Sequence, residues 1–229
     1  MSSVFVDLLA LSIASAMGPG QIIFDTLLLL SSERAVKKAG FFVAGMTFVR
    51  LVQGIVFGFV LNEAVNSVSK SSQPKAISST LLLVLGIVLL ISAYKQWNKE
   101  DETDGSQPKW LSMIEGLTPI KAFAIGSILV ATSPNLWIFT LNAIAVISEA
   151  QLSQLDAMIA FLLFILVAEL LVLSPILMRI LMPDKSIKYL HAISDWLNKN
   201  NRTLMTVISL VFGVYFLVKG VSNLLVLGQ

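Results

Sequence analysis

The chain contains no cysteine and only one histidine, His191. The absence of cysteine excludes disulfide bonds, thiolate metal sites and thiol redox relays. A single histidine outside the apolar segments also argues against a histidine-rich metal site, so we expect no metal and no cofactor. The motifs GxSxG, GxxxxGK[ST] and HExxH are all missing. No cluster of catalytic residues is therefore visible, and we expect no enzymatic activity.

Charged residues are also scarce, at 13% of 229 residues, whereas 56% are hydrophobic and the mean hydropathy is +0.83. This composition is too apolar for a soluble domain. A membrane-spanning helix needs about 20 mostly apolar residues. Six segments meet this requirement: 3–30, 39–62, 77–95, 119–148, 156–181 and 203–227. We predict an all-α polytopic membrane protein with six transmembrane helices and no nucleic-acid partner.

The first and fourth of these segments each contain a proline near the middle. Such a proline can simply kink a packed transmembrane helix. Discontinuous helices at corresponding places in two internal repeats, however, indicate the binding site of a transporter. We therefore predict that substrate is bound around both breaks, by Pro19, Gly20, Gln21, Pro134 and Asn135.

Lysine and arginine are unevenly distributed between the connecting segments. The segments after the first, third and fifth spans carry twelve of them, and the opposite face carries three. The positive-inside rule then places the three basic segments in the cytoplasm and both termini outside the inner (plasma) membrane. Three spans per half give the halves opposite orientations, which is the geometry of an inverted repeat. We divide the chain into a first repeat (1–95), a cytoplasmic linker (96–118) and a second repeat (119–229).

Within the second repeat, residues 187–198 place Ile187, Leu190, Ile193 and Leu197 on one helical face. This pattern predicts an amphipathic helix lying on the cytoplasmic leaflet. Such a helix either contacts lipid headgroups as part of the function or only anchors the connection.

The ionisable residues Asp25, Arg50 and Glu169 fall inside predicted spans, more than four residues from either end. Each costs roughly 2.5–3.5 kcal/mol at the bilayer centre, so we expect them to face the bundle interior or a cavity. Arg50 and Glu169 hold roughly equivalent places in the two halves, and we expect them to meet. If all three are ionised their charges sum to −1, and one proton neutralises the set, as a proton-coupled carrier requires. Alternatively, Arg50 and Glu169 form an ion pair that only fixes helix register.

Further polar residues share helix faces with these groups. Gln21 and Asp25 lie one turn apart, and Asn142 lies seven residues after Asn135. Gln53 lies on the same helix face as Arg50. We add Asp25, Gln53 and Asn142 to the predicted substrate-binding residues. The start of a half-helix favours an anionic group, either a headgroup phosphate or a carboxylate.

Gly54 and Gly58 form a small-xxx-small pair in the second predicted span. Such pairs let helices approach closely. The pair serves either packing inside the protomer or contact with a second copy in a homodimer.

The chain resembles the LysE/GAP superfamily of small membrane exporters, and within it the GAP branch, also called Sap, the sulfolipid-addressing proteins. The resemblance covers nearly the whole chain. It rests on short motifs at residues 18–23, 29–35, 39–41, 44–45, 133–136, 196–197, 200–201 and 213. It implies a six-helix exporter built from inverted three-helix repeats. The GAP branch is associated with moving or addressing cell-envelope glycolipids, and the LysE branch exports amino acids.

Pro19, Pro134 and the polar Asn135 match the family pattern, but the chain also departs from it. Relatives often have a lysine between the proline and the asparagine of the fourth helix, whereas here Asn135 follows Pro134 directly. A substrate contact by that lysine therefore does not transfer. The redox members of the superfamily use paired cysteines, which this chain lacks.

Three functions follow from these observations. The first is an exporter of a lipid-like or small organic substrate, such as an amino acid, with membrane lipids as partners. The second is a non-transporting membrane partner of an envelope export system. The third, an integral-membrane enzyme acting on lipids, has no catalytic cluster to support it. A cavity that reaches Asp25, Arg50 and Glu169 favours the first function, and a dry, closed bundle favours the second.

Overall fold

The computed structural model describes residues 2–31, 34–67, 73–98 and 116–227. These residues are mostly α-helical. The helices are α1 (Ser2–Ala16), α2 (Pro19–Leu30), α3 (Ala35–Ser67), α4 (Gln73–Trp97), α6 (Pro119–Thr132), α7 (Pro134–Glu149), α8 (Gln154–Leu181) and α9 (Pro183–Leu227). Most of the predicted linker 96–118 lies outside the described residues.

The helices α3, α4, α8 and α9 are each long and apolar enough to cross a membrane. The pairs α1–α2 and α6–α7 also pass this test, but they bend by 54° and 73° at their breaks. Counting each bent pair as one span gives up to six spans among the described residues. The prediction of an all-helical multi-pass membrane protein with breaks at Pro19 and Pro134 is confirmed.

The two prolines cause the breaks in the same way. Each is the first residue of a new helix, where its missing N–H and fixed φ angle cause no loss. The residue before each proline leaves the helical conformation, with ψ 103° at Gly18 and ψ 107° at Ser133. This is the extended backbone that a following proline favours. The chain then resumes as a helix in a new direction.

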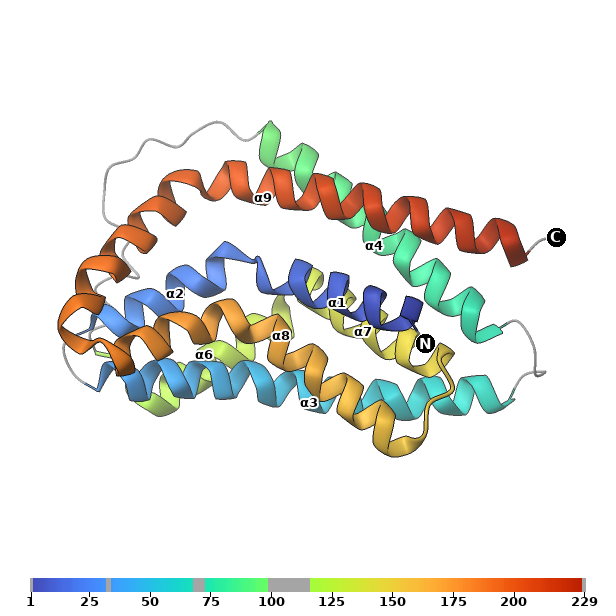
Figure 1. Ribbon diagram of the computed structural model, residues 1–229, viewed down its shortest axis with the longest axis horizontal. Helices are drawn as coiled ribbons and strands as arrows, with labels where there is room; N and C mark the ends of the chain where they lie inside the picture. Colours follow the sequence, from blue (N-terminus) through green and yellow to red (C-terminus); the bar gives the residue numbers. More distant parts are fainter. Residues whose placement is uncertain (1, 32–33, 68–72, 99–115, 228–229) are drawn as a thin grey trace.

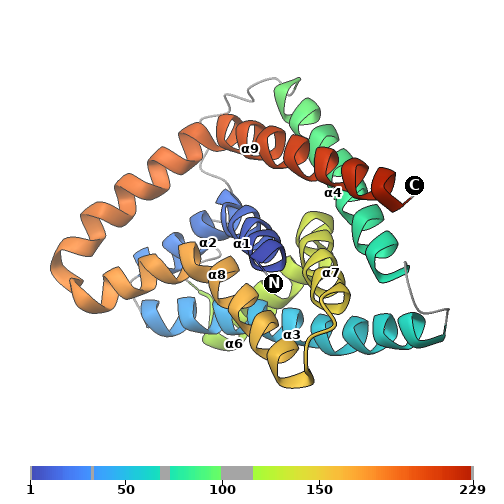
Figure 2. The same ribbon diagram turned by 45° about the vertical axis from the view of Figure 1, so that its right-hand side comes forward.

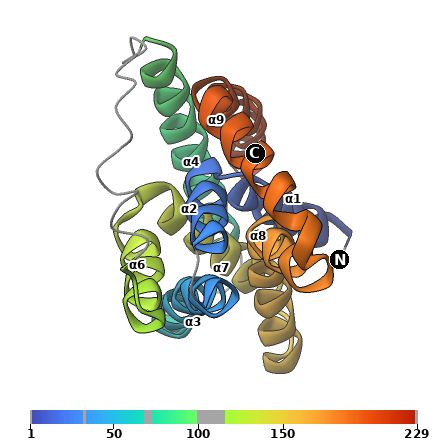
Figure 3. The ribbon, with the colours of Figure 1, turned by 90° about the vertical axis from the view of Figure 1, so that its left-hand side faces the viewer.

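The second halves of the two broken spans, α2 and α7, lie toward the middle of the bundle. Looking along the long axis, Figure 3 shows α2 and α7 toward the middle, with α4 and α9 above them and α3 below. The start of α1 and the end of α9 lie at the same end of the molecule, together with the α7–α8 connection (Figure 1). The ends of α2 and α8 lie at the opposite end.

Glycines allow the backbones of two pairs of crossing helices to approach closely. A Cβ added at Gly86 of α4 would lie 2.5 Å from the backbone nitrogen of Leu217 in α9. A Cβ added at Gly45 of α3 would lie 2.1 Å from the carbonyl oxygen of Phe123 in α6. Only a residue without a side chain fits these positions, as expected where helix backbones touch within a membrane.

The apolar core is divided into two clusters along the bundle. One cluster includes Leu11, Phe139 and Phe164, and the other includes Phe42 and Val172. Buried polar residues lie on the same helices as these clusters, and they include Ser15, Gln21, Asp25, Arg50, Gln53 and Glu169. Polar groups inside an apolar bundle cost free energy unless they are paired, so they indicate function.

Residues 187–198, predicted to form an amphipathic helix, are helical and are the first part of the continuous helix α9. Residues 184–212 contain neither proline nor glycine, so nothing in the sequence ends the helix before the last span. Figure 2 shows α9 starting beside the end of α8 and then running along α4. Leu190 and Leu197 are buried, whereas Tyr189 and Trp196 are exposed.

Candidate functional site

A cavity of about 200 Å³ lies where the two helix breaks meet; we call it the central cavity. The first break contributes Gly18, Pro19, Gly20 and Gln21, and the second contributes Ser133 and Asn135. The remaining lining residues come mainly from α1, α4, α7 and α9: Ala14, Ser15, Met17, Leu89, Leu129, Leu136, Phe139, Met205, Ile208 and Ser209. None of these side chains is charged.

The starts of both half-helices, α2 and α7, face the central cavity. Gly20 and Gln21 lie in the first turn of α2, Asn135 and Leu136 lie in the first turn of α7, and all four line the cavity. The first N–H groups of a helix have no partner within it and carry a partial positive charge. Gln21 is buried, and its Oε1 atom has no hydrogen-bond partner among the described residues. The cavity thus offers donors and an unpaired polar atom to a ligand.

Side chains satisfy the carbonyl ends of the two preceding half-helices. The Nε2 atom of Gln21 donates to the carbonyl oxygen of Ser15 at 3.3 Å. The indole Nε1 atom of Trp137 donates to the carbonyl oxygen of Ala131 at 2.7 Å. Each donor lies six residues after its acceptor. The two breaks are therefore stabilised in corresponding ways.

Arg50 of α3 and Glu169 of α8 form a buried ion pair. The Nε atom of Arg50 lies 3.5 Å from Oε1 of Glu169, and both side chains are almost inaccessible to solvent. The Oγ1 atom of Thr47 donates to Oε2 of Glu169 at 2.6 Å. The guanidinium carbon of Arg50 lies 5.9 Å from the ring centroid of Phe164, within cation–π range. The structure thus brings Arg50 and Glu169 together, as we expected from the sequence.

Ser15 connects this ion pair to the central cavity. The Nη2 atom of Arg50 donates to Oγ of Ser15 at 3.1 Å, and Ser15 lines the cavity. The same serine accepts the hydrogen bond from Gln21 through its carbonyl oxygen. A continuous set of contacts therefore runs from Glu169 through Arg50 and Ser15 to the first helix break. A change of charge or position at the ion pair has a direct route to the cavity wall.

Asp25 and Gln53 are buried but line neither the central cavity nor the second cavity described below. Asp25 is completely buried in α2, and neither of its carboxylate oxygens has a hydrogen-bond partner among the described residues. Gln53 of α3 is also buried, and both polar atoms of its amide are unpartnered in the same part of the chain. Unpaired buried polar groups are costly and rare, so each of these requires an explanation.

Two other predicted site residues also lie outside the lining of both cavities. Pro134 starts α7, but the residues on either side of it, Ser133 and Asn135, form the cavity wall. Asn142 is buried, and its Nδ2 atom donates to the carbonyl oxygens of Leu81 at 3.3 Å and Ile138 at 2.8 Å. Its observed contacts hold α7 against α4.

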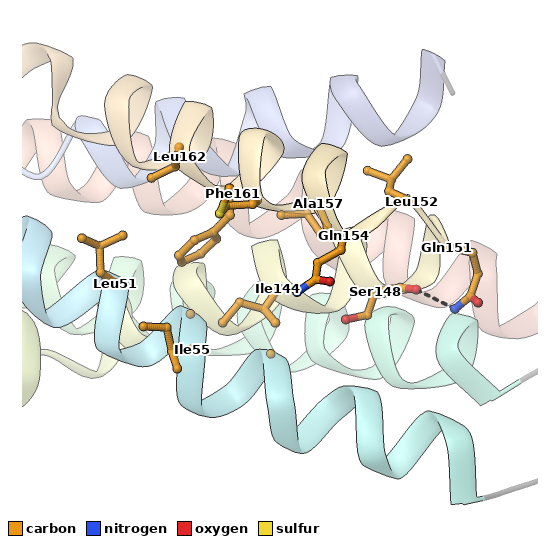
Figure 4. Close-up of a pocket in the computed structure, with 14 residues that line it drawn as sticks. Leu51, Ile55, Ile144, Ser148, Gln151, Leu152, Gln154, Ala157, Phe161 and Leu162 are labelled. Carbon is orange, nitrogen blue, oxygen red and sulfur yellow. Dashed lines mark hydrogen bonds between the residues drawn. The ribbon is translucent and has the colours of Figure 1, made fainter.

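A larger cavity of about 800 Å³ lies between α3, α7 and α8, and we call it the lateral groove. Figure 4 shows Leu51 and Ile55 of α3 on one side and Phe161 of α8 on the other. Ser148, Gln151 and Gln154 lie at the end near the α7–α8 connection (Figure 4). The groove lining also includes Gly54, Gly58, Ile144, Ile147, Leu152, Ala157, Met158 and Leu162.

Ser15, Thr47 and Ser209 were not predicted from the sequence. Thr47 lies one turn before Arg50, so helical spacing alone was a usable signal for it. Ser15 and Ser209 are small polar residues in apolar helices, where serine is common, and their role depends on how the helices pack. The contribution of α4 and α9 to the cavity likewise follows from packing.

The fold and the central cavity define a class: an all-helical, multi-pass membrane protein whose two broken helices meet at an internal cavity. A family model described as "Sap, sulfolipid-1-addressing protein" matches residues 8–222, and the chain belongs to this family. The resemblance seen in the sequence is confirmed at this level. No curated protein and no solved structure matches the chain.

Proposed function

We propose that the protein is an exporter that moves an amphiphile across the membrane, with the anionic head group of the amphiphile held in the central cavity. The observation that carries this proposal is the meeting of two half-helix starts, those of α2 and α7, at one cavity. Discontinuous helices that present their N-terminal ends to anionic groups are a recurring device of transporters. The family name, which refers to a sulfolipid, supports an amphiphilic substrate.

Matched helix contacts support an inverted-repeat architecture in which α1, α2, α3 and α4 correspond to α6, α7, α8 and α9. Under this exchange, the packing of α3 on α6 corresponds to that of α8 on α1. The packing of α4 on α7 likewise corresponds to that of α9 on α2. The pairs α4–α9 and α3–α8 exchange with themselves. Such pairing is expected of two repeats related by a pseudo-twofold axis.

We place both termini outside, in the plasma membrane. The start of α1 and the end of α9 lie at one end of the bundle (Figure 1). The basic residues Lys38, Lys121, Arg179, Lys185 and Lys188 lie near helix ends at the other end of the bundle, which supports a cytoplasmic location for that end.

We further propose that transport is coupled to protons through Asp25, Arg50 and Glu169. The ion pair is linked to the cavity wall by Ser15, so protonation of Glu169 would release Arg50 and alter the wall at the first break. Asp25 supplies a second buried carboxyl group, one turn after the cavity residue Gln21.

The size of the central cavity favours a second candidate, the export of a small anionic solute such as an amino acid. About 200 Å³ holds a head group or a small solute but not a whole lipid. For a lipid, the acyl chains must therefore lie outside this cavity. The lateral groove is a second, apolar site of lipid size within the membrane-spanning region, and its presence favours an amphiphile over a small solute.

The test is a translocation assay in proteoliposomes with a fluorescent sulfated glycolipid, whose movement between leaflets is read by chemical quenching from outside. Gly20 lines the central cavity, and an added Cβ there meets nothing within 4 Å. Gly20→Leu should therefore fill the cavity without a clash. We expect it to slow translocation by about tenfold, the change that ~1.4 kcal/mol produces in a rate.

The matched control is Gly40→Leu. Gly40 lies on α3 outside both cavities, and an added Cβ there also meets nothing within 4 Å. We expect this variant to translocate the probe at the wild-type rate. The proposal fails if the wild-type protein moves neither the glycolipid nor small anionic solutes across the liposome membrane.

A further inference from the structure

The lateral groove differs from the central cavity in position and in lining. It lies between α3 and α8, two helices that are long and apolar enough to span the membrane. Ile55, Met158 and Leu162 at its border are exposed on the outer surface of the bundle. Within a membrane these side chains meet lipid, so the groove opens sideways into the bilayer rather than only to water.

The lining of the groove has a polar end and an apolar body. Its hydrogen-bonding side chains, Ser148, Gln151 and Gln154, gather at the α7–α8 connection, where the Nε2 atom of Gln151 donates to the carbonyl oxygen of Ser148 at 2.9 Å (Figure 4). Toward the membrane interior the groove is lined by Leu51, Ile144 and other apolar residues. This order matches that of a lipid, with its head at the membrane surface and its chain below.

We infer that the lateral groove binds the acyl chain of a membrane lipid, while Ser148, Gln151 and Gln154 bind uncharged hydroxyl or ester groups of its head. No lining residue among the described part of the chain is charged, so the groove does not select a head by its net charge. Lipid tails gain no hydrophobic free energy on leaving the bilayer. Preference for the groove must therefore come from packing along the chain and from these hydrogen bonds.

The backbone at the polar end is consistent with this role. Gln151 has a positive φ of 49°, a conformation that non-glycine residues seldom adopt. The strained turn directs the chain from the end of α7 into α8 and keeps Gln151 at the border of the groove. Strain of this kind often accompanies binding sites.

Aromatic side chains separate the groove from the ion pair. Phe161 lines the groove and stacks on Phe164, with ring centroids 6.0 Å apart and an interplanar angle of 19°. Phe164 in turn lies under the guanidinium group of Arg50. A chain held in the groove is therefore close to the contacts that lead through Ser15 to the central cavity. The groove's role in holding the transported amphiphile rests on the proposed function, whereas lipid binding there does not.

The experiment is photo-crosslinking in phosphatidylcholine nanodiscs that contain a small fraction of monoglucosyl diacylglycerol with a diazirine in its acyl chain. Labelled peptides are located by mass spectrometry. We expect labelling to concentrate on residues 51–58 and 154–162. An added Cβ at Gly58 meets nothing within 4 Å, so Gly58→Leu should block the groove and reduce this labelling by about tenfold through lost chain packing.

Gly40→Leu, on the same helix but outside the groove, is the matched control and should label as the wild type does. If Gly58→Leu does not fold, Met158→Trp at the exposed border serves instead. Labelling spread evenly over the outer surface, or unchanged in the blocked variants, would overturn the inference. Selective labelling without translocation of any probe would support the groove and contradict the proposed function.

Discussion

At the scale of single residues, the proposed transport mechanism depends most on the ion pair between Arg50 and Glu169. Both residues are buried, and within the described part of the chain Ser15, Thr47 and the ring of Phe164 supplement their attraction. Removing one partner from a buried pair costs about 3–5 kcal/mol, whereas replacing both by apolar residues is often neutral. This difference separates a functional pair from one that only fixes helix register.

We predict that Arg50→Met alone lowers the thermal stability of the detergent-solubilised protein and abolishes translocation. The double variant Arg50→Met with Glu169→Met should recover most of the lost stability, because no unpaired charge remains. Translocation should stay abolished in the double variant. Recovery of both properties would show that the pair is only structural.

Glu169→Gln gives a complementary prediction. The amide has nearly the same shape and can still accept the hydrogen bond from Thr47, but it cannot exchange a proton at neutral pH. We expect the protein to fold and the dependence of translocation on pH to disappear. The measurement is the rate in proteoliposomes across a pH series, and an unchanged profile would contradict proton coupling through Glu169.

Asp25 makes a separate prediction about stability and activity. Its carboxylate oxygens are buried without partners, and such a group costs about 1–3 kcal/mol. Asp25→Leu should therefore raise the melting temperature while it lowers translocation, a trade-off typical of functional polar groups. Asp25→Asn retains a polar group and should lower translocation with a smaller gain in stability. An active Asp25→Leu protein would remove Asp25 from the mechanism.

At the scale of helices, close crossings determine where the broken spans meet. The contacts at Gly45 and Gly86 are with backbone atoms of neighbouring helices, which cannot rotate away as a side chain can. The crossing of α4 with α9 supplies one wall of the central cavity through Leu89 and Ser209. Separation of these helices would therefore change the cavity as well as the stability.

We predict that Gly86→Ala lowers the free energy of unfolding by roughly 1–3 kcal/mol, the usual cost of overpacking. Gly40→Ala has open space around the added methyl group, so it should be neutral or stabilise α3 by about 0.5–1 kcal/mol. Thermal unfolding in detergent compares the two variants. Equal stability of both would mean that the α4–α9 crossing is looser than the structure indicates.

The helix breaks were predictable from sequence because proline acts locally. Pro19 and Pro134 each stop one helix and start the next, whatever surrounds them. The pairing of Arg50 with Glu169 was also predictable, since two buried opposite charges favour each other. The unpaired state of Asp25 was not, because it depends on which side chains α3, α8 and α9 bring against α2.

At the scale of the whole molecule, the lateral groove and the central cavity arise only from packing. The residues of the groove are ordinary in sequence, and α3, α7 and α8 must converge before they form a common surface. The same holds for α9, whose predicted interfacial part is continuous with the last span. Composition and charge distribution, by contrast, were sufficient to predict a helical multi-pass membrane protein.

The proposed orientation has a simple test, since the chain has no cysteine to remove. Gln154 and His191 are both exposed. Gln154 is the first residue of α8, and His191 lies in the first part of α9, which starts at the opposite end of the bundle from the start of α8. On intact cells, a membrane-impermeant maleimide should label Gln154→Cys and leave His191→Cys unlabelled until the cells are opened. The reverse pattern would invert the topology.

The most direct test of a substrate site at the helix breaks is the reactivity of a thiol placed in the central cavity. Asn135 lines the cavity at the second break. Asn142 lies two helical turns further along α7, is buried and lines neither cavity. A methanethiosulfonate reagent should modify Asn135→Cys in proteoliposomes, a sulfated glycolipid should slow that modification, and Asn142→Cys should stay unmodified. Equal reactivity of the two thiols, or no protection of Asn135→Cys by the glycolipid, would contradict a substrate site at the helix breaks.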